Sequence, residues 1–265
     1  MRLAHEIYGL DGARETALLI AHGVFGSARN WGTLARRFSA GRPVVAVDMR
    51  NHGDSGAAEE MSYPSMGDDL LETAAALFER PALLLGHSMG GKAAMAAALR
   101  APDAVAGLIV ADIAPVAYVD GQLRGYLDAM RALPLDVAGG RAGLAAQLEA
   151  ATPNRAIRDF LLSNVAFDRS GPTPTARWRL NLDGLSAGVD DVVGWPDALS
   201  ERRYDGPTLF IHGGASDYVS AEGRARATAL FPNAVFETLG GAGHWLHAEQ
   251  PDAFFARVSA WLEGR

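Results

Sequence analysis

The sequence predicts an α/β fold with a mostly parallel sheet, helices on both faces and an inserted, mainly helical lid. Short apolar runs rich in Val, Ile and Leu alternate with helical patterns along residues 17–111. This alternation is typical of a parallel sheet that is buried on both faces. It stops in the middle of the chain and resumes near its end. We therefore expect residues 1–115 and 206–265 to form the core and residues 116–205 to form the lid.

The composition excludes several classes of protein. Apolar residues make up 49% and charged residues 21% of the 265-residue chain, as in globular proteins. The net charge of −7 argues against nucleic acids and anionic membranes as partners. The chain has no cysteine, which rules out thiol catalysis and thiolate metal sites, and we expect neither a metal nor another cofactor. Residues 1–6 lack the apolar core of a signal peptide, so we expect a cytoplasmic location.

The first half of the chain supplies most of the expected core. Apolar runs of strand length predict strands at residues 3–8, 17–21, 43–47, 83–85 and 105–111. Apolar residues at helical spacing predict helices at residues 30–39 and 64–79, and an alanine-rich segment predicts a third helix that ends at Leu99.

The second half contains the expected lid and the end of the core. Helical patterns occur at residues 123–133, 144–151 and 157–165, followed by a looser piece with residues 171–174 and 178–182. No long buried strand is expected within the lid. Strands are predicted again at residues 207–212 and 234–239, and a final amphipathic helix at residues 252–262.

A serine stands where the predicted strand at residues 83–85 turns into a helix. Gly86-His87-Ser88-Met89-Gly90 matches the G-x-S-x-G motif, which exposes a nucleophile when it lies between a strand and a helix. The turn strains the backbone at the serine, so its neighbours must be small, as Gly86 and Gly90 are. The hydroxyl would stand at a helix N-terminus, whose amides stabilise negative charge. We therefore predict that Ser88 is the nucleophile.

A serine hydroxyl needs a base, usually a histidine held by a carboxylate. His244 follows a glycine-rich loop after the last predicted strand and comes last in the order nucleophile, acid, histidine. We therefore predict that His244 is the base. The other histidines are assigned elsewhere: His5 and His212 to strands, His22 and His87 to structural or backbone-positioning roles, His52 to the mouth of the site, and His247 to a supporting or capping role.

Two aspartates compete for the role of the acid. Asp112 directly follows the strand at residues 105–111, and adjacent parallel strands end at the same edge of a sheet. Asp217 lies in the loop after the penultimate strand, which is the usual place for the acid. However, Ser216 occupies the usual position and Asp217 comes one residue late. We prefer Asp112 and keep Asp217 as the alternative.

The oxyanion hole needs two backbone amides aimed at the developing negative charge. One should come from Met89, directly after the nucleophile. The other should come from the loop after the second strand, either from Val24 or, as the alternative, from Phe25. For substrate binding we expect the side chains of Phe25 and Trp245, with Met89, to line the acyl pocket, and Trp178 of the lid to affect the size of the substrate.

Two further features are assigned no catalytic role. Residues 48–55 form a dense polar cluster at a strand end, and we expect their Arg and Asp side chains to hold the neighbouring turns. Lys92 is the only lysine in the chain, and we assign it nothing beyond helix or loop contacts.

Five motifs together resemble the YbfF-type esterases of the α/β-hydrolase superfamily. The motifs are His22-Gly23-Val24-Phe25-Gly26-Ser27, Asp48-Met49-Arg50-Asn51-His52-Gly53, Gly86-His87-Ser88-Met89-Gly90-Gly91-Lys92, Ala111-Asp112-Ile113-Ala114-Pro115 and Ala242-Gly243-His244-Trp245-Leu246-His247-Ala248-Glu249. The resemblance implies a serine hydrolase that acts on small-molecule acyl esters or thioesters, acyl-CoA among them. It also implies Asp112 as the acid, although Asp217 stands where members of that family carry a non-acidic residue.

Two other functions are compatible with the same fold. A lyase of the menaquinone-pathway type uses a similar serine–histidine pair and needs arginines that converge on carboxylates. Arg124, Arg177 and Arg179 of the lid could supply them. A ligand receptor built on a hydrolase scaffold is the non-enzymatic alternative, which an intact Ser88, His244 and acid argue against. The fold alone does not fix the substrate, and the sequence leaves the oligomeric state open.

Overall fold

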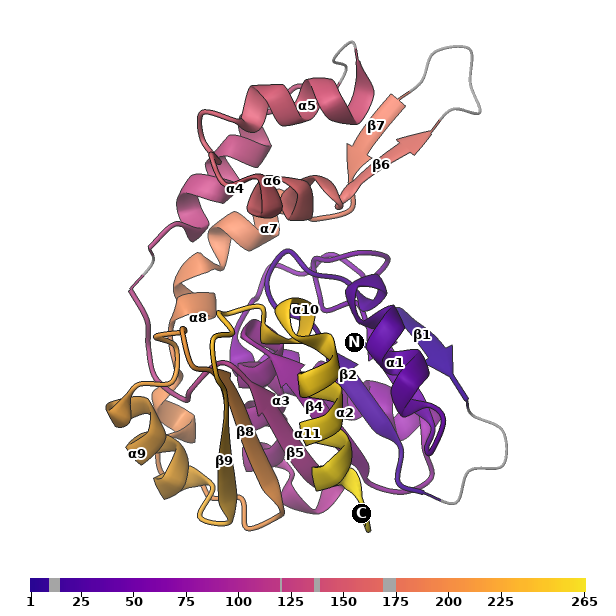
Figure 1. Ribbon diagram of the computed structural model, residues 1–265, viewed down its shortest axis with the longest axis vertical. Coiled ribbons are helices and arrows are strands. Elements are labelled where there is room, and N and C mark those ends of the chain that lie inside the picture. Colours follow the sequence, from indigo (N-terminus) through magenta and orange to yellow (C-terminus); the bar gives the residue numbers. More distant parts are fainter. Residues whose placement is uncertain (10–14, 120, 136–138, 169–174) are drawn as a thin grey trace.

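A seven-stranded sheet forms the centre of the computed structural model, which describes residues 1–9, 15–119, 121–135, 139–168 and 175–265 (Figure 1). Its strands are β1 (His5–Tyr8), β2 (Leu18–Ala21), β3 (Val44–Val47), β4 (Ala82–His87), β5 (Val105–Ala111), β8 (Thr208–Gly213) and β9 (Ala234–Leu239). Their order is β1-β3-β2-β4-β5-β8-β9. Strand β1 runs antiparallel to β3, and the other neighbouring pairs are parallel. The predicted α/β fold with a mostly parallel sheet is confirmed.

Helices cover both faces of this sheet. On one face lie α1 (Gly32–Phe38) and α11 (Pro251–Leu262), and on the other lie α2 (Tyr63–Leu77), α3 (Met89–Arg100) and α9 (Ala221–Leu230). Strand residues alternate between the two faces, so that Leu18 and Ile20 pack with α1 and α11 while Leu19 and Ala21 pack with α2 and α3. Both faces of the sheet are therefore buried beneath helices, as the continuous apolar runs predicted.

Several short elements were not predicted from the sequence. The helix expected at residues 30–39 begins with a 3-10 turn, η1 (Ala28–Trp31), and two further 3-10 turns are η2 (Pro102–Ala104) and η3 (Asp197–Leu199). Helix α9 was not predicted because it buries little apolar surface, chiefly at Ala227 and Leu230. A single turn, α10 (Leu246–Glu249), precedes α11.

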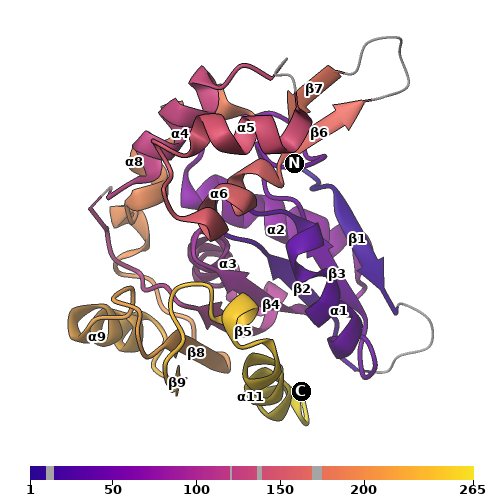
Figure 2. The same ribbon diagram turned by 45° about the horizontal axis from the view of Figure 1, so that its top comes forward.

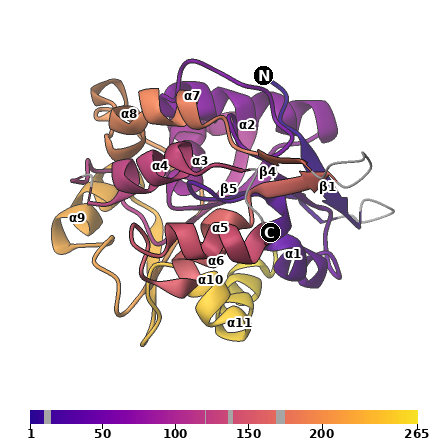
Figure 3. The same ribbon diagram turned by 90° about the horizontal axis from the view of Figure 1, so that it is seen from above.

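The described residues within 116–205, called the covering segment below, lie over the carboxyl ends of the parallel strands (Figures 2 and 3). They contain α4 (Leu123–Ala132), α5 (Gly140–Leu148), α6 (Arg155–Leu162), β6 (Val165–Asp168), β7 (Thr175–Trp178), α7 (Leu182–Ala187) and α8 (Val189–Val193). Strands β6 and β7 pair as an antiparallel hairpin that was not expected. The looser piece predicted at residues 171–174 lies outside the described residues, and the division into core and lid stays a prediction. None of the described helices is long and apolar enough to cross a bilayer.

Candidate active site

Ser88 lies in a strained turn between β4 and α3. Its backbone has φ 52° and ψ −119°, a conformation that non-glycine residues rarely adopt. The neighbouring glycines allow this turn, because a Cβ atom on Gly86 would lie 2.1 Å from the carbonyl oxygen of Gly90. A Cβ atom on Gly90 would lie 2.4 Å from the carbonyl oxygen of Ala21. Any larger residue at either position would therefore displace the serine.

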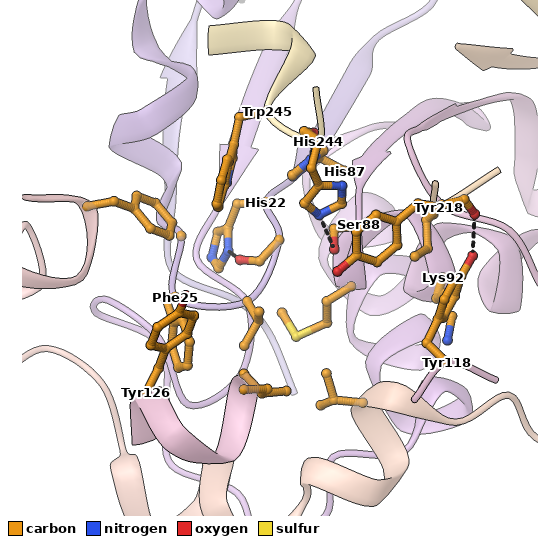
Figure 4. Close-up of a pocket in the computed structure, with 18 of the residues that line it drawn as sticks. His22, Phe25, His87, Ser88, Lys92, Tyr118, Tyr126, Tyr218, His244 and Trp245 are labelled. Atoms are coloured by element: carbon orange, nitrogen blue, oxygen red, sulfur yellow. Dashed lines mark hydrogen bonds between the residues drawn. The ribbon is translucent and has the colours of Figure 1, made fainter. Parts of the chain in front are cut away.

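Ser88, His244 and Asp112 form a continuous chain of hydrogen bonds, of which Figure 4 shows the link between His244 and Ser88. The Nε2 atom of His244 lies 3.1 Å from the Oγ atom of Ser88. The Nδ1 atom of His244 lies 2.7 Å from Oδ2 of Asp112. Because a carboxylate only accepts hydrogen bonds, the Nδ1–H group donates to Asp112 and leaves Nε2 to accept from the serine hydroxyl. The ring of Tyr218 stacks on the imidazole with centroids 4.0 Å apart and fixes its plane.

The carboxylate of Asp112 is fully buried directly after β5. Its Oδ1 atom accepts a hydrogen bond from the backbone N–H of Gly213 at 2.9 Å. Its Oδ2 atom accepts one from the hydroxyl of Ser216 at 2.5 Å, besides that from His244. Asp112 also has a positive φ of 52°, which turns its side chain toward the histidine. The structure thus brings Asp112 to His244, whereas the alternative, Asp217, is exposed.

Ser216 stands where the sequence argument placed the usual acid. Its hydroxyl instead supports the carboxylate that arrives from the neighbouring strand. A signal for this position was present in the sequence, because the serine occupied the expected site of an aspartate. Its hydrogen bond to Asp112 could not be inferred from that signal, since it depends on which strand supplies the acid.

The amides of Val24 and Phe25, in the loop after β2, differ in their hydrogen bonds. The backbone N–H of Phe25 donates to Nε2 of His52 at 3.1 Å and is therefore occupied. Among the hydrogen bonds of the described residues, none uses the backbone N–H of Val24. With the amide of Met89 at the start of α3, this leaves Val24 and Met89 as the pair of donors. The geometry favours Val24 over the alternative, Phe25.

Three buried histidines brace the site and stay uncharged. His22 accepts from the backbone N–H of Met49 at 2.9 Å, and burial lowers the pKa of His22 to about 4. His52 was expected at the mouth of the site, but it is fully buried, and burial lowers its pKa to about 3. His87 donates from Nε2 to the backbone carbonyl of His244 at 2.8 Å, and burial lowers the pKa of His87 well below its ordinary value. The prediction for His52 was wrong because its ring holds the backbone beneath the pocket.

Ser88 lines a cavity of about 480 Å³, a size common for small-molecule sites. Its lining is mainly apolar and includes Phe25 and Trp245, as predicted. Ile157 and Phe160 of the covering segment form part of its wall. Trp178 is absent from the lining residues described and packs instead against buried side chains of its surroundings. This position does not favour the predicted effect of Trp178 on the size of the substrate.

Lys92 has more contacts than its sequence position suggested. It lies one helical turn after Ser88 and is 1% exposed. Its Nζ atom donates to the backbone carbonyls of Gly194 at 2.6 Å and Val193 at 3.1 Å. The ammonium group also lies 4.6 Å from the ring centroid of Tyr118. Burial lowers the pKa of Lys92 to about 7. This lysine joins α3 to the end of α8.

The arginines proposed for lyase chemistry do not converge on the cavity. Arg124 pairs with Asp190, and Arg179 pairs with Asp54 at 2.8 Å. In the part of the chain that the structure describes, no arginine lines the cavity. The geometry therefore does not favour the lyase alternative.

The polar cluster at residues 48–55 holds turns together, as expected. Asp48 accepts hydrogen bonds from the backbone N–H groups of Ala28 and Asp54, both at 2.8 Å. Arg50 forms a buried ion pair with Asp69, with Nε and Oδ2 2.7 Å apart. These contacts fix the loops that lie under the pocket.

The comparisons with known proteins agree with this fold. The chain matches the family model of the α/β hydrolase fold over residues 16–251. It is 40% identical over 261 residues to "sn-1-specific diacylglycerol lipase ABHD11" of Mus musculus, covering 96% of this chain and 83% of that protein. It is 37% identical over 245 residues to "Esterase YbfF" of Escherichia coli K12, covering 92% of each. The solved structure of a marine microorganism esterase superposes with a TM-score of 0.91 at 32% identity, covering 98% of this chain and 99% of that one.

Proposed function

The chain belongs to the α/β hydrolase family and is an esterase-type serine hydrolase; from this premise we propose that it cleaves carboxylic esters through an acyl group carried on Ser88. The observation that carries the proposal is the chain of contacts from Ser88 through His244 to Asp112, at 3.1 and 2.7 Å. This arrangement supplies the nucleophile, the base and the orienting carboxylate in their required order.

The proposed reaction has two halves. The Oγ atom of Ser88 attacks the ester carbon while Nε2 of His244 takes the hydroxyl proton. The carbonyl oxygen gains the electron pair and is stabilised by the amides of Val24 and Met89. When the tetrahedral intermediate collapses, the C–O bond breaks and His244 gives its proton to the leaving alcohol. A water molecule then attacks the acyl group by the same route, and the acid and free Ser88 are released.

Oxygen esters with an apolar acyl group fit the cavity best. Its mainly apolar lining supports the binding of hydrocarbon, and the similar mouse protein is named a diacylglycerol lipase. A coenzyme A thioester carries several phosphates, whereas no arginine is found among the lining residues described and the net charge is −7. We therefore place thioesters second. The lack of cysteine supports a cytoplasmic location as part of this proposal.

A substrate panel with a matched variant tests the proposal. Purified wild type and Ser88→Ala would be assayed on p-nitrophenyl esters from acetate to palmitate and on acyl-CoAs of the same lengths. We expect the wild type to prefer the oxygen esters and Ser88→Ala to lose nearly all turnover while keeping its fold. Near-wild-type rates in Ser88→Ala would contradict the mechanism, and a preference for acyl-CoA would reverse the assignment of substrate class.

A further inference from the structure

The loop after β2, which carries the amide of Val24, contains a residue with a strained backbone, as the turn at Ser88 does. The backbone N–H of Gly26 donates to the carbonyl of Gly23 at 2.9 Å, which closes a four-residue turn with Val24 and Phe25 in its centre. Phe25 has a φ of 61° and is 4% exposed. A positive φ at this position of a turn ordinarily calls for glycine, and a bulky aromatic residue is strained there. Something outside the turn must therefore hold Phe25 in place.

Two side chains hold the backbone of Phe25, one on each side. Its N–H donates to Nε2 of His52, which belongs to the core. Its carbonyl accepts a hydrogen bond from Nδ2 of Asn164 at 2.8 Å. Asn164 belongs to the covering segment, in the connection between α6 and β6, and is 3% exposed. The strained turn is thus fixed by one residue of the core and one of the covering segment.

Asn164 is itself held firmly by its own segment. Its Nδ2 atom also lies 3.3 Å from the carbonyl of Leu161. Its backbone carbonyl accepts from the N–H of Arg179 at 2.8 Å, just after β7. Asn164 therefore links the loop that contains Phe25 to both α6 and the β6–β7 hairpin.

We propose that Asn164 is a positioning residue, whose side-chain amide holds the Gly23–Gly26 turn so that the N–H of Val24 faces the developing oxyanion. The inference rests on the proposed function, because it assumes that Val24 supplies one donor of the oxyanion hole. Without the hydrogen bond from Asn164, Phe25 can relax toward negative φ and carry the preceding amide out of line. The covering segment then does more than enclose the substrate, since its placement also assembles half of the oxyanion hole.

The test uses Asn164→Asp, which keeps the shape but replaces the donating NH₂ group by oxygen, and Asn164→Ala, which removes the donor without adding charge. The matched control is Asn181→Asp. Asn181 also belongs to the covering segment and donates from Nδ2 to Oδ1 of Asn51 at 2.9 Å, but no hydrogen bond found among the described residues joins it to the turn. Thermal unfolding of each variant shows whether it is folded at the assay temperature.

Two readouts separate positioning from a general structural role. The first is kcat and KM for p-nitrophenyl acetate, a substrate too small to need the outer wall of the cavity. The second is the affinity for an alkyl trifluoromethyl ketone. Ser88 Oγ adds to the ketone carbon, His244 takes the proton, and the ketone oxygen becomes an oxyanion in the same hole. We expect both Asn164 variants to lose about 10- to 100-fold in kcat and in ketone affinity, with KM changed less than about threefold, because removal of one oxyanion donor outright costs about 10²–10³.

The possible outcomes are distinct. Loss of ketone affinity in the two Asn164 variants, with Asn181→Asp near wild type, supports the inference. Unchanged ketone affinity in folded Asn164→Ala, or an equal loss in Asn181→Asp, overturns it while leaving the esterase mechanism intact. A wild type that neither hydrolyses p-nitrophenyl acetate nor binds the ketone overturns the proposed function and the inference with it.

Discussion

The groups that we propose to react and the groups that enclose the substrate come from different parts of the molecule. Ser88, Asp112 and His244 follow β4, β5 and β9 of one sheet, where parallel strands fix each position. The outer wall of the cavity comes from helices of the covering segment, such as α6 with Ile157 and Phe160. This difference shows that the backbone of the sheet holds the three reacting groups in place. The side chains of the wall determine the size of the substrate, and they can change without moving those three groups.

Of the changes to the reacting groups, removal of the base His244 should cause the largest loss of activity. We expect His244→Ala to lower kcat/KM by roughly 10⁴- to 10⁶-fold, because the serine then has no proton acceptor. Steady-state hydrolysis of p-nitrophenyl butyrate measures the loss. His212→Gln is the control, since His212 lies at the end of β8 and does not line the cavity. An active His244→Ala together with an inactive His52→Ala or His247→Ala would show that the base has been misassigned.

The two aspartates give the next largest contrast. Asp112→Asn should lower kcat by about 10⁴, since the carboxylate no longer orients His244 or stabilises its charged form. Ser216→Ala should cost about tenfold, because it removes one hydrogen bond to a charged group. Asp217→Asn should stay within about twofold, as its side chain is exposed. Parallel kinetics on the three variants check this order, and a severe Asp217→Asn with a mild Asp112→Asn would move the acid to Asp217.

Changes to the side chains of the covering segment that line the cavity should affect chain-length preference more than the chemistry. We expect Phe160→Ala to change the ratio of kcat/KM for the octanoate and acetate esters by roughly tenfold, because it removes part of an apolar wall. Trp178→Ala is the matched control, since Trp178 does not line the cavity in the part of the chain described. If Trp178→Ala shifts the ratio and Phe160→Ala does not, the wall has been placed wrongly.

The smallest predicted effect concerns stability at the contact between α3 and the covering segment. Lys92 loses its proton at a pKa of about 7 in the folded state, against its ordinary 10.5. Between these values the unfolded state binds more protons, so the free energy of unfolding should rise with pH by up to about 1.4 kcal/mol per pH unit. Lys92→Met should remove this rise. Urea unfolding at pH 7, 8 and 9 measures it, and equal slopes for the two proteins would contradict the prediction.

Local patterns predicted the parts of the site that depend on one element at a time. Gly86 and Gly90 around Ser88 indicated a strained turn between strand and helix, and the glycine loop before His244 indicated the edge of the sheet. The parallel sheet followed from continuous apolar runs, whose residues alternate between two dry faces. Each of these inferences needs only neighbours in the sequence.

Features that join distant segments could not be predicted in the same way. The choice between Asp112 and Asp217 depends on the positive φ of Asp112 and on Ser216, which lies 104 residues further along the chain. The contact of Asn164 with Phe25 spans 139 residues and has no periodic pattern. His52 was misplaced for the same reason, since its burial depends on the turn that packs over it.

Covalent labelling of Ser88 tests the central claim most directly. A fluorophosphonate would be incubated with the wild type, Ser88→Ala and Asn181→Asp, and the intact masses and labelled peptides would be measured. The Oγ atom of Ser88 should displace fluoride from phosphorus, so we predict one adduct on the peptide that contains Ser88 in the wild type and in Asn181→Asp, and none in Ser88→Ala. An adduct of equal yield on Ser88→Ala, or on another residue of the wild type, would contradict the account.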